Sequence, residues 1–226
     1  MGESRLEVRL AHWGRRGPLV AGIGAIVLTG ILGIIIALRG SNQFSVDLSW
    51  MSEIIEHRSP LWTAPALFFD YAGGGVVGTI IVPPAIVLIL VAFRRFWGAA
   101  FFAIASVASV VTVEILKNTV DRTRPQEILV ATDFGSFPSG HTADAATMAG
   151  VLMLLFPRIW VWISGVGWMA LMAFSRTYLG AHWLSDTVGG VLLGGGIALI
   201  TWAVLARPLA REREQPHRFI RHRTPT

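Results

Sequence analysis

The residues best suited to chemistry are two histidines, His141 and His182, each at the edge of an apolar run. His141 belongs to the turn Phe137-Pro138-Ser139-Gly140-His141-Thr142, which opens directly onto apolar residues. The first amides of a helix are unpaired and carry the positive end of its dipole, so this turn suits an anion, and phosphate is the obvious candidate. A proline, a serine and a glycine before a helix are also ordinary loop residues.

Asp186 follows His182 by four residues. In a helix both side chains would share one face, and the carboxylate could accept a hydrogen bond from the imidazole ring. That bond would fix the tautomer and make the other ring nitrogen a better nucleophile. Taken alone, the two residues are better explained as a pair that satisfies itself at a helix end. His141 would be the proton donor in the same reaction.

Three basic residues, Lys117, Arg124 and Arg176, also lie at the ends of apolar runs. A cation at the centre of a membrane helix costs on the order of 3 kcal/mol on insertion scales. Each of the three therefore either extends its charge to the membrane interface or holds an anion. With the two histidines they could form the charge clamp that phosphoryl transfer requires.

The composition is that of a membrane protein. Of 226 residues, 53% are hydrophobic and 15% are charged, and mean hydropathy is +0.59. The net charge of +5 comes from arginines at the chain ends and between apolar runs, which fits the positive-inside rule and not a nucleic-acid partner. The chain has no cysteine, which excludes disulfides, thiol catalysis and thiolate metal sites.

The apolar runs predict an all-α, polytopic membrane protein with six transmembrane helices in one bundle. The expected spans are residues 17–38, 73–93, 96–116, 142–156, 159–174 and 185–206, the second kinked at Pro83-Pro84. We expect one domain, residues 17–206, between a cytoplasmic segment, residues 1–16, and a basic, disordered cytoplasmic tail, residues 207–226. Glycines in the last span predict close helix packing.

An interfacial amphipathic segment, residues 44–57, is expected between the first two spans. Trp50, Met51, Ile54 and Ile55 are spaced as one helix face, with Asp47, Glu53 and Glu56 off that face. The segment either shields an opening or is an ordinary surface helix.

The basic residues outside the spans predict the orientation. If the N-terminus is cytoplasmic, then Arg94-Arg95, Arg158 and the arginine-rich tail are cytoplasmic too, and an even number of spans fits. The end of the third span, the start of the fourth, the end of the fifth and the start of the sixth then lie together at the outer face. The polar clusters described above all fall there.

The three clusters together resemble the type 2 phosphatidic acid phosphatase (PAP2) superfamily, which also includes the vanadium haloperoxidases. The pattern is lysine, six residues and Arg-Pro; then Pro-Ser-Gly-His; then Ser-Arg, five residues, histidine, three residues and aspartate. Lys117 with Arg124-Pro125, Pro138 to His141, and Ser175-Arg176 with His182 and Asp186 match it without a gap. The motifs cover about a fifth of the chain, and the six-span layout resembles the family's membrane branch.

The resemblance implies a role for each matching residue. His182 would attack phosphorus and become a phosphohistidine while Asp186 holds its ring, and His141 would protonate the leaving oxygen and then activate water. Lys117, Arg124, Arg176, Ser139 and the Gly140 amide would bind the phosphoryl oxygens. No metal or cofactor is implied.

The expected substrate is a lipid phosphate at the membrane interface, such as undecaprenyl diphosphate, phosphatidic acid or phosphatidylglycerol phosphate. The alternatives are a catalytically silent relative, which should have lost a motif residue, and a lipid or solute transporter, which should have more polar residues in mid-span. Glu114, three residues before Lys117, is interpreted as an ion-pair partner or a core hydrogen-bonding group, and Asp144 either orients His141 or interacts with the helix dipole. Asp121 and Asp133 are interpreted as solvated loop charges.

Overall fold

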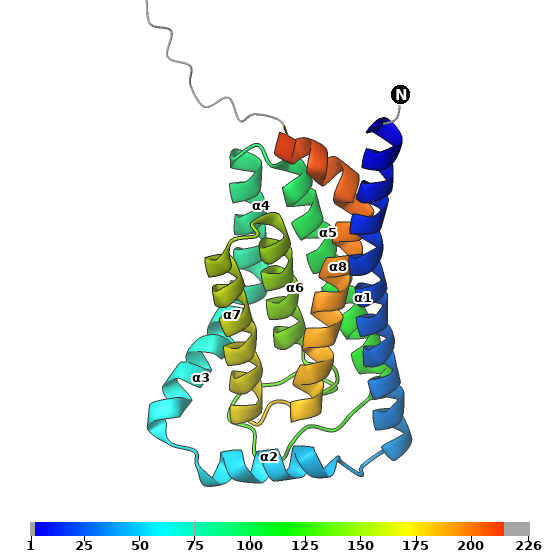
Figure 1. Cartoon of the computed structure of the whole chain (residues 1–226). Helices are drawn as coiled ribbons and strands as arrows, with labels where there is room; N and C mark the ends of the chain where they lie inside the picture. Colours follow the sequence, from blue (N-terminus) through cyan, green and yellow to red (C-terminus); the bar gives the residue numbers. More distant parts are fainter. Residues whose placement is uncertain (1–2, 75, 215–226) are drawn as a thin grey trace, which may run out of the picture.

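Every regular element in the part of the chain that the computed structural model describes, residues 3–74 and 76–214, is a helix (Figure 1). In chain order these are α1 (Glu3–Arg39), α2 (Ser45–Glu56), α3 (Pro60–Gly73), the π-helix η1 (Val76–Ile81), α4 (Val82–Ala92), α5 (Phe96–Val120), α6 (Gly140–Leu155), α7 (Ile159–Tyr178) and α8 (Leu184–Glu214). The expected all-α class is confirmed.

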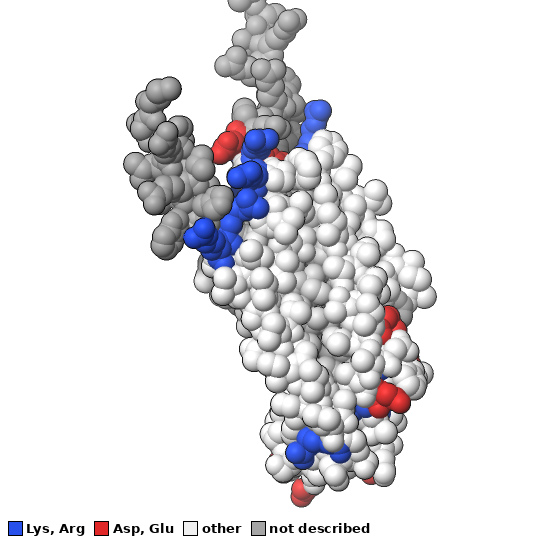
Figure 2. All heavy atoms as spheres, turned by 90° about the vertical axis from the view of Figure 1, so that its right-hand side faces the viewer, with Lys and Arg blue, Asp and Glu red and all other residues white. Residues whose placement is uncertain are grey.

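Within the described residues, five segments are long and apolar enough to cross a membrane, which makes this a multi-pass membrane protein: Arg15–Arg39, Pro60–Ala92, Phe96–Val120, Ile159–Tyr178 and Leu184–Glu214. Figure 2 agrees, because a broad uncharged band separates the charged side chains at its two ends. The remaining expected span is α6, which has 16 residues and is about 24 Å long at 1.5 Å per residue. A count of six spans is therefore not established by helix length.

Helix α6 lies at the centre of the bundle, packed against α5, α7 and α8 (Figure 1). Its close contact with α8 requires a glycine on α8. A Cβ on Gly194 would lie 2.1 Å from the carbonyl oxygen of Ala143, so only glycine allows the two backbones to come this close. The predicted close packing through glycine is confirmed at this position, and it fixes the start of α6 against the start of α8.

The second span begins earlier than expected and breaks at a different place. It starts at Pro60 instead of Gly73, and its helix is interrupted between Gly73 and Val76 instead of at Pro83-Pro84. The chain passes from η1 into α4 just before Pro83-Pro84, and the prolines lie in the first turn of α4, where a missing backbone donor is tolerated. A Cβ on Gly74 would lie 1.9 Å from Nε2 of His141, so the break brings bare backbone against that ring.

The last helix also extends beyond its predicted end. Residues 207–214, assigned to a disordered tail, continue α8, whereas residues 215–226 and residues 1–2 lie outside the described part of the chain. The extension is anchored by Glu212, whose carboxylate accepts hydrogen bonds from the backbone amides of Trp97 and Gly98 at 2.6 and 3.0 Å. An acidic side chain at a helix N-terminus is stabilised by the unpaired amides and the dipole.

Helix α2 lies across the end of the bundle, between α1 and α3 (Figure 1). Its buried face includes Met51 and Ile54, as expected, but also Asp47, which was expected off that face. Positions 47, 51 and 54 are separated by one helical turn each, so they share a side.

Asp47 is buried because it has a buried partner. Its carboxylate accepts hydrogen bonds from the Arg122 guanidinium at 2.7 Å and from the Ser185 amide at 2.8 Å. The same guanidinium donates to Asp186. The side chains of Asp47 and Asp186 are 0% exposed and that of Arg122 is 1% exposed. One arginine thus ties α2 and the start of α8 to the segment after α5.

Replacing Arg122 by alanine should therefore destabilise the protein strongly, because two buried carboxylates would lose their counter-ion. Breaking a buried pair in this way costs about 3–5 kcal/mol. Thermal unfolding of the purified protein in detergent should show a clear fall in Tm for Arg122→Ala. Arg158→Ala, which removes an exposed arginine, is the control and should leave Tm unchanged. Equal Tm values for both variants would contradict a structural role for Arg122.

Candidate active site

The three motif-bearing segments meet at the end of the bundle that carries α2. Lys117 is in the last turn of α5, His141 is the second residue of α6, and His182 lies between α7 and α8. Direct contacts join the segments: the Ser139 amide donates to the Asp186 carbonyl oxygen at 3.0 Å, and Nη1 of Arg124 lies 3.3 Å from Nε2 of His182. The sequence prediction that these segments converge on one face is therefore confirmed.

The two ring nitrogens of His182 have different partners: one is bound to a backbone carbonyl, and the other faces the Arg124 guanidinium. Its Nδ1 lies 2.7 Å from the backbone carbonyl oxygen of Ser136, and its Nε2 faces Arg124. A carbonyl oxygen can only accept, so Nδ1 carries the proton, and the unprotonated Nε2 accepts a hydrogen bond from the Arg124 guanidinium. Burial, together with the charges of Arg176 and Arg124, holds the pKa of His182 well below its ordinary value. The ring is consequently neutral near pH 7.

The expected hydrogen bond between His182 and Asp186 is replaced by other contacts. The nearest carboxylate oxygen of Asp186 is 3.7 Å from Nδ1, and its hydrogen bonds go to Arg122 and to the Trp183 backbone amide, the latter at 2.9 Å. The reason is that α8 begins at Leu184, so His182 precedes the helix and the i, i+4 geometry does not apply. Asp186 instead reaches back to the residue before the helix, as in a capping box. It positions the loop that carries His182.

The three motif cations are buried, and each is paired with a carboxylate. Lys117 and Arg124 both bind Asp133, whose carboxylate bridges them, and Arg176 binds Asp70. Asp133 is an exposed loop residue, as predicted, with a side chain 62% exposed, but the prediction missed that each of its carboxylate oxygens binds a cation. Glu114 lies 3.8 Å from Nζ of Lys117, in agreement with its predicted role as an ion-pair partner.

His141 is the more accessible histidine, with a side chain 25% exposed against 3% for His182. Its Nε2 lies 3.6 Å from the carboxylate of Asp70 on α3, next to Arg176. The Ser139 hydroxyl does not share this environment, since it is fully buried and lies 3.0 Å from the Thr142 hydroxyl. The Ser139 side chain therefore does not face the site, and its backbone amide joins the start of α6 to Asp186.

Sequence reasoning missed Asp70, Arg122 and Ser136. For Asp70 a signal existed, because an acidic residue inside an apolar run needs a partner and Arg176 is such a partner. The Ser136 carbonyl and the Arg122 side chain gave no such signal, since their contacts join residues 46 and 64 positions apart.

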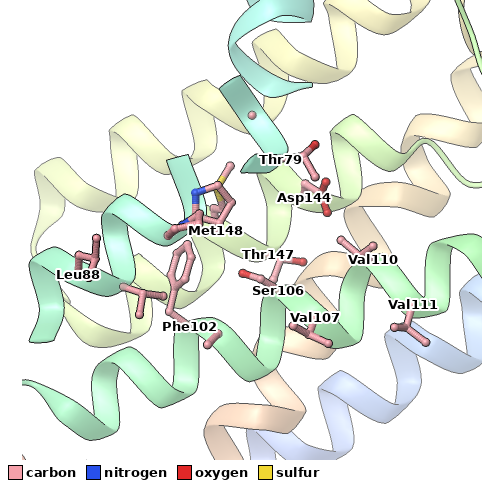
Figure 3. Close-up of a pocket in the computed structure, with 15 residues that line it drawn as sticks. Thr79, Leu88, Phe102, Ser106, Val107, Val110, Val111, Asp144, Thr147 and Met148 are labelled. Atoms are coloured by element: carbon pink, nitrogen blue, oxygen red, sulfur yellow. The ribbon is translucent and has the colours of Figure 1, made fainter. Parts of the chain in front are cut away.

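Two neighbouring cavities open beside these residues. A polar cavity of about 230 Å³ has Lys117, Asp133, Gly140 and His141 on its walls. An apolar cavity of about 560 Å³ lies between η1 and α4 on one side and α5 and α6 on the other (Figure 3). Thr79, Val110 and Asp144 line both cavities, so the apolar space adjoins the polar cavity that contains Lys117 and His141.

One further group of acidic and histidine side chains, Glu53, Glu56 and His57, brings its ligating atoms within 4.8 Å of one another in the described part of the chain. It lies on the exposed side of α2, whose buried side includes Asp47. Exposed acidic groups of this kind are common without a metal ion.

The chain is similar in sequence to known phosphatases and in fold to a solved crystal structure. An undecaprenyl-diphosphatase of Sulfolobus acidocaldarius is 32% identical over 126 residues, covering 52% of this chain and 60% of that protein, less than two thirds of its length. A decaprenylphosphoryl-5-phosphoribose phosphatase of Mycobacterium tuberculosis is 31% identical over 183 residues, 76% of this chain and 96% of that protein. The crystal structure of Aquifex aeolicus LpxE is similar with a TM-score of 0.64 and 26% identity, over 72% of this chain and 98% of that one.

The family model of the PAP2 superfamily matches residues 96–209, which run from the start of α5 into the last turns of α8. This range contains all three motif segments and the buried contacts between them. The family model covers half of the chain. The similarity to the Mycobacterium tuberculosis relative extends over 96% of that relative's length. The chain belongs to the PAP2 superfamily.

Proposed function

We propose that this protein is a membrane phosphatase that removes phosphate from the headgroup of a lipid phosphate through a phosphohistidine on His182. One observation carries the proposal: His182 presents an unprotonated Nε2 beside the Arg124 guanidinium while Nδ1 is bound to the Ser136 carbonyl. A neutral imidazole whose unprotonated nitrogen points toward a buried guanidinium has the charge state and the surroundings that an attack on an anionic phosphoryl group requires. The names of two relatives, an undecaprenyl-diphosphatase and a decaprenylphosphoryl-5-phosphoribose phosphatase, support the same reaction.

In the first step, Nε2 of His182 forms a bond to phosphorus as the bond from phosphorus to the lipid oxygen breaks. Lys117, Arg124 and Arg176 stabilise the negative charge on the phosphoryl oxygens, together with the amides at the start of α6. His141 donates a proton to the lipid oxygen, which leaves as a hydroxyl, or as a lipid monophosphate if the substrate is a diphosphate. Burial and the charge of Arg176 lower the pKa of His141 to about 3 in the free protein, so it takes up this proton once the negative phosphoryl group is bound beside it.

In the second step, water attacks the phosphorus of the phosphohistidine. His141, now neutral, accepts a proton from that water, the bond between nitrogen and phosphorus breaks, and inorganic phosphate is released. Nδ1 of His182 keeps its proton in both steps and donates it in a hydrogen bond to the Ser136 carbonyl oxygen. The electrostatic stabilisation comes from the side chains and the helix end.

A lipid substrate is supported by the apolar cavity that adjoins the site (Figure 3). An acyl or prenyl chain could occupy this space while its phosphate reaches the cations. Undecaprenyl diphosphate, phosphatidic acid and phosphatidylglycerol phosphate are the substrates to test first. A polyprenyl-linked phosphosugar joins them because the Mycobacterium tuberculosis relative, which acts on such a lipid, matches over almost its whole length.

Substitution of His182 by alanine should abolish phosphate release from these lipids. The loss should be roughly 10³-fold or more in kcat, because no other group can form the covalent intermediate. The assay is release of inorganic phosphate by purified protein with EDTA present throughout. His57→Ala, which removes an exposed histidine directly after α2, is the matched control and should keep full activity. Full activity of His182→Ala, or loss of wild-type activity on adding EDTA, would contradict the mechanism.

We also propose that both chain termini are cytoplasmic and that the site faces outside. Because the chain has no cysteine, single cysteines can report this directly. With an impermeant maleimide, Gln126→Cys, exposed beside the site, should label in intact cells, whereas Arg158→Cys, exposed between α6 and α7, should label only after permeabilisation. The reverse pattern would place the site in the cytoplasm.

A further inference from the structure

Asp133 occupies the two cations that a substrate phosphate would need. One oxygen of its carboxylate binds Nζ of Lys117, and the other binds Nη2 of Arg124. These cations are nearly inaccessible, with side chains 6% and 9% exposed, while the Asp133 side chain is 62% exposed. The carboxylate therefore reaches into the site from the solvent side and bridges the cations with two oxygens, the arrangement in which two phosphoryl oxygens would bind them.

The backbone around Asp133 is held independently of its side chain. Arg124 also donates to the backbone carbonyl oxygens of Asp133 and Gly135, at 3.1 and 2.7 Å. Gly135 has a positive φ of 64°, and a Cβ there would lie 3.1 Å from the Lys117 carbonyl oxygen. These contacts remain if the carboxylate turns away, and its exposed position leaves room for that movement. Displacing the side chain therefore does not require the loop to unfold.

The carboxyl group is charged under ordinary conditions. Partial burial by itself raises the pKa of Asp133, but the hydrogen bond and charge of Lys117 and the charge of Arg124 outweigh it and leave the pKa below its ordinary value. An anion thus competes with phosphate for the same two cations at neutral pH. Glu114, 3.8 Å from Lys117, and Asp70 on Arg176 do not bridge these two residues.

We propose that Asp133 is an internal competitor of the phosphoryl group, which binds Lys117 and Arg124 between turnovers and is displaced by substrate. The inference rests on the proposed function, because it assigns those two cations to phosphate. When a site is occupied by its own side chain for most of the time, the apparent affinity for a ligand falls by the fraction that is free. The same competition speeds release of inorganic phosphate, the last product of the reaction.

The test is the affinity of the purified protein for inorganic phosphate, measured by calorimetry in detergent. Asp133→Asn keeps the shape of the side chain and removes its charge, so it should bind phosphate about tenfold more tightly than wild type. In the lipid assay it should show a lower KM, stronger inhibition by phosphate and no gain in kcat. Glu127→Gln removes an exposed charge from the same loop and should change none of these values.

If Asp133 only held Lys117 and Arg124 in place, Asp133→Asn would bind phosphate as weakly as wild type or more weakly and would raise KM. Either result, or no measurable binding in both proteins, would overturn the inference. The two proposals can fail separately. Hydrolysis with unchanged phosphate affinity in Asp133→Asn would overturn only the competitor role, while tighter binding without hydrolysis of any lipid would overturn only the phosphatase function.

Discussion

The structure depends on how four buried cations are neutralised at one end of an apolar bundle. Lys117, Arg122, Arg124 and Arg176 have side chains no more than 9% exposed, and unpaired charges there would cost several kcal/mol each. The counter-ions come from four different segments: Asp47 on α2, Asp70 on α3, Asp133 between α5 and α6, and Asp186 on α8. Pairing the cations therefore also assembles the fold around the site.

The carboxylates of these pairs differ in how exposed they are. The buried ones stabilise the fold, and the exposed ones lie at the candidate active site. Asp47, Arg122 and Asp186 are fully enclosed, which suits a permanent link between α2, α8 and the loop of His182. Asp133 and Asp70 are 62% and 28% exposed and bind the cations expected to hold phosphate. A carboxylate that water can reach is exchanged for a phosphate more easily than one that cannot be resolvated. The exposed pairs thus mark where a substrate can enter.

The sequence predicted the helical class and the convergence of the three motif segments, because hydropathy and motif spacing are local signals. It failed where a residue's surroundings depend on distant parts of the chain. Asp47 was placed off the buried helix face, and the ion pairs of Asp133 were missed, because their partners, Arg122 and the pair Lys117 and Arg124, are brought to them only by folding. The His182–Asp186 spacing was misleading since the helix begins between them. The break at Gly74 reflects contact with His141, which no local pattern contains.

The most direct test of the proposed chemistry is to look for the covalent intermediate. Wild-type protein would be mixed with a lipid phosphate, denatured in alkaline detergent during turnover, and digested for mass spectrometry of the peptide that contains His182. We predict phosphate on Nε2 of His182, and none on His141 or on a His182→Ala control. Steady hydrolysis with no phosphate on His182, or with phosphate on His141, would contradict the assignment of the nucleophile.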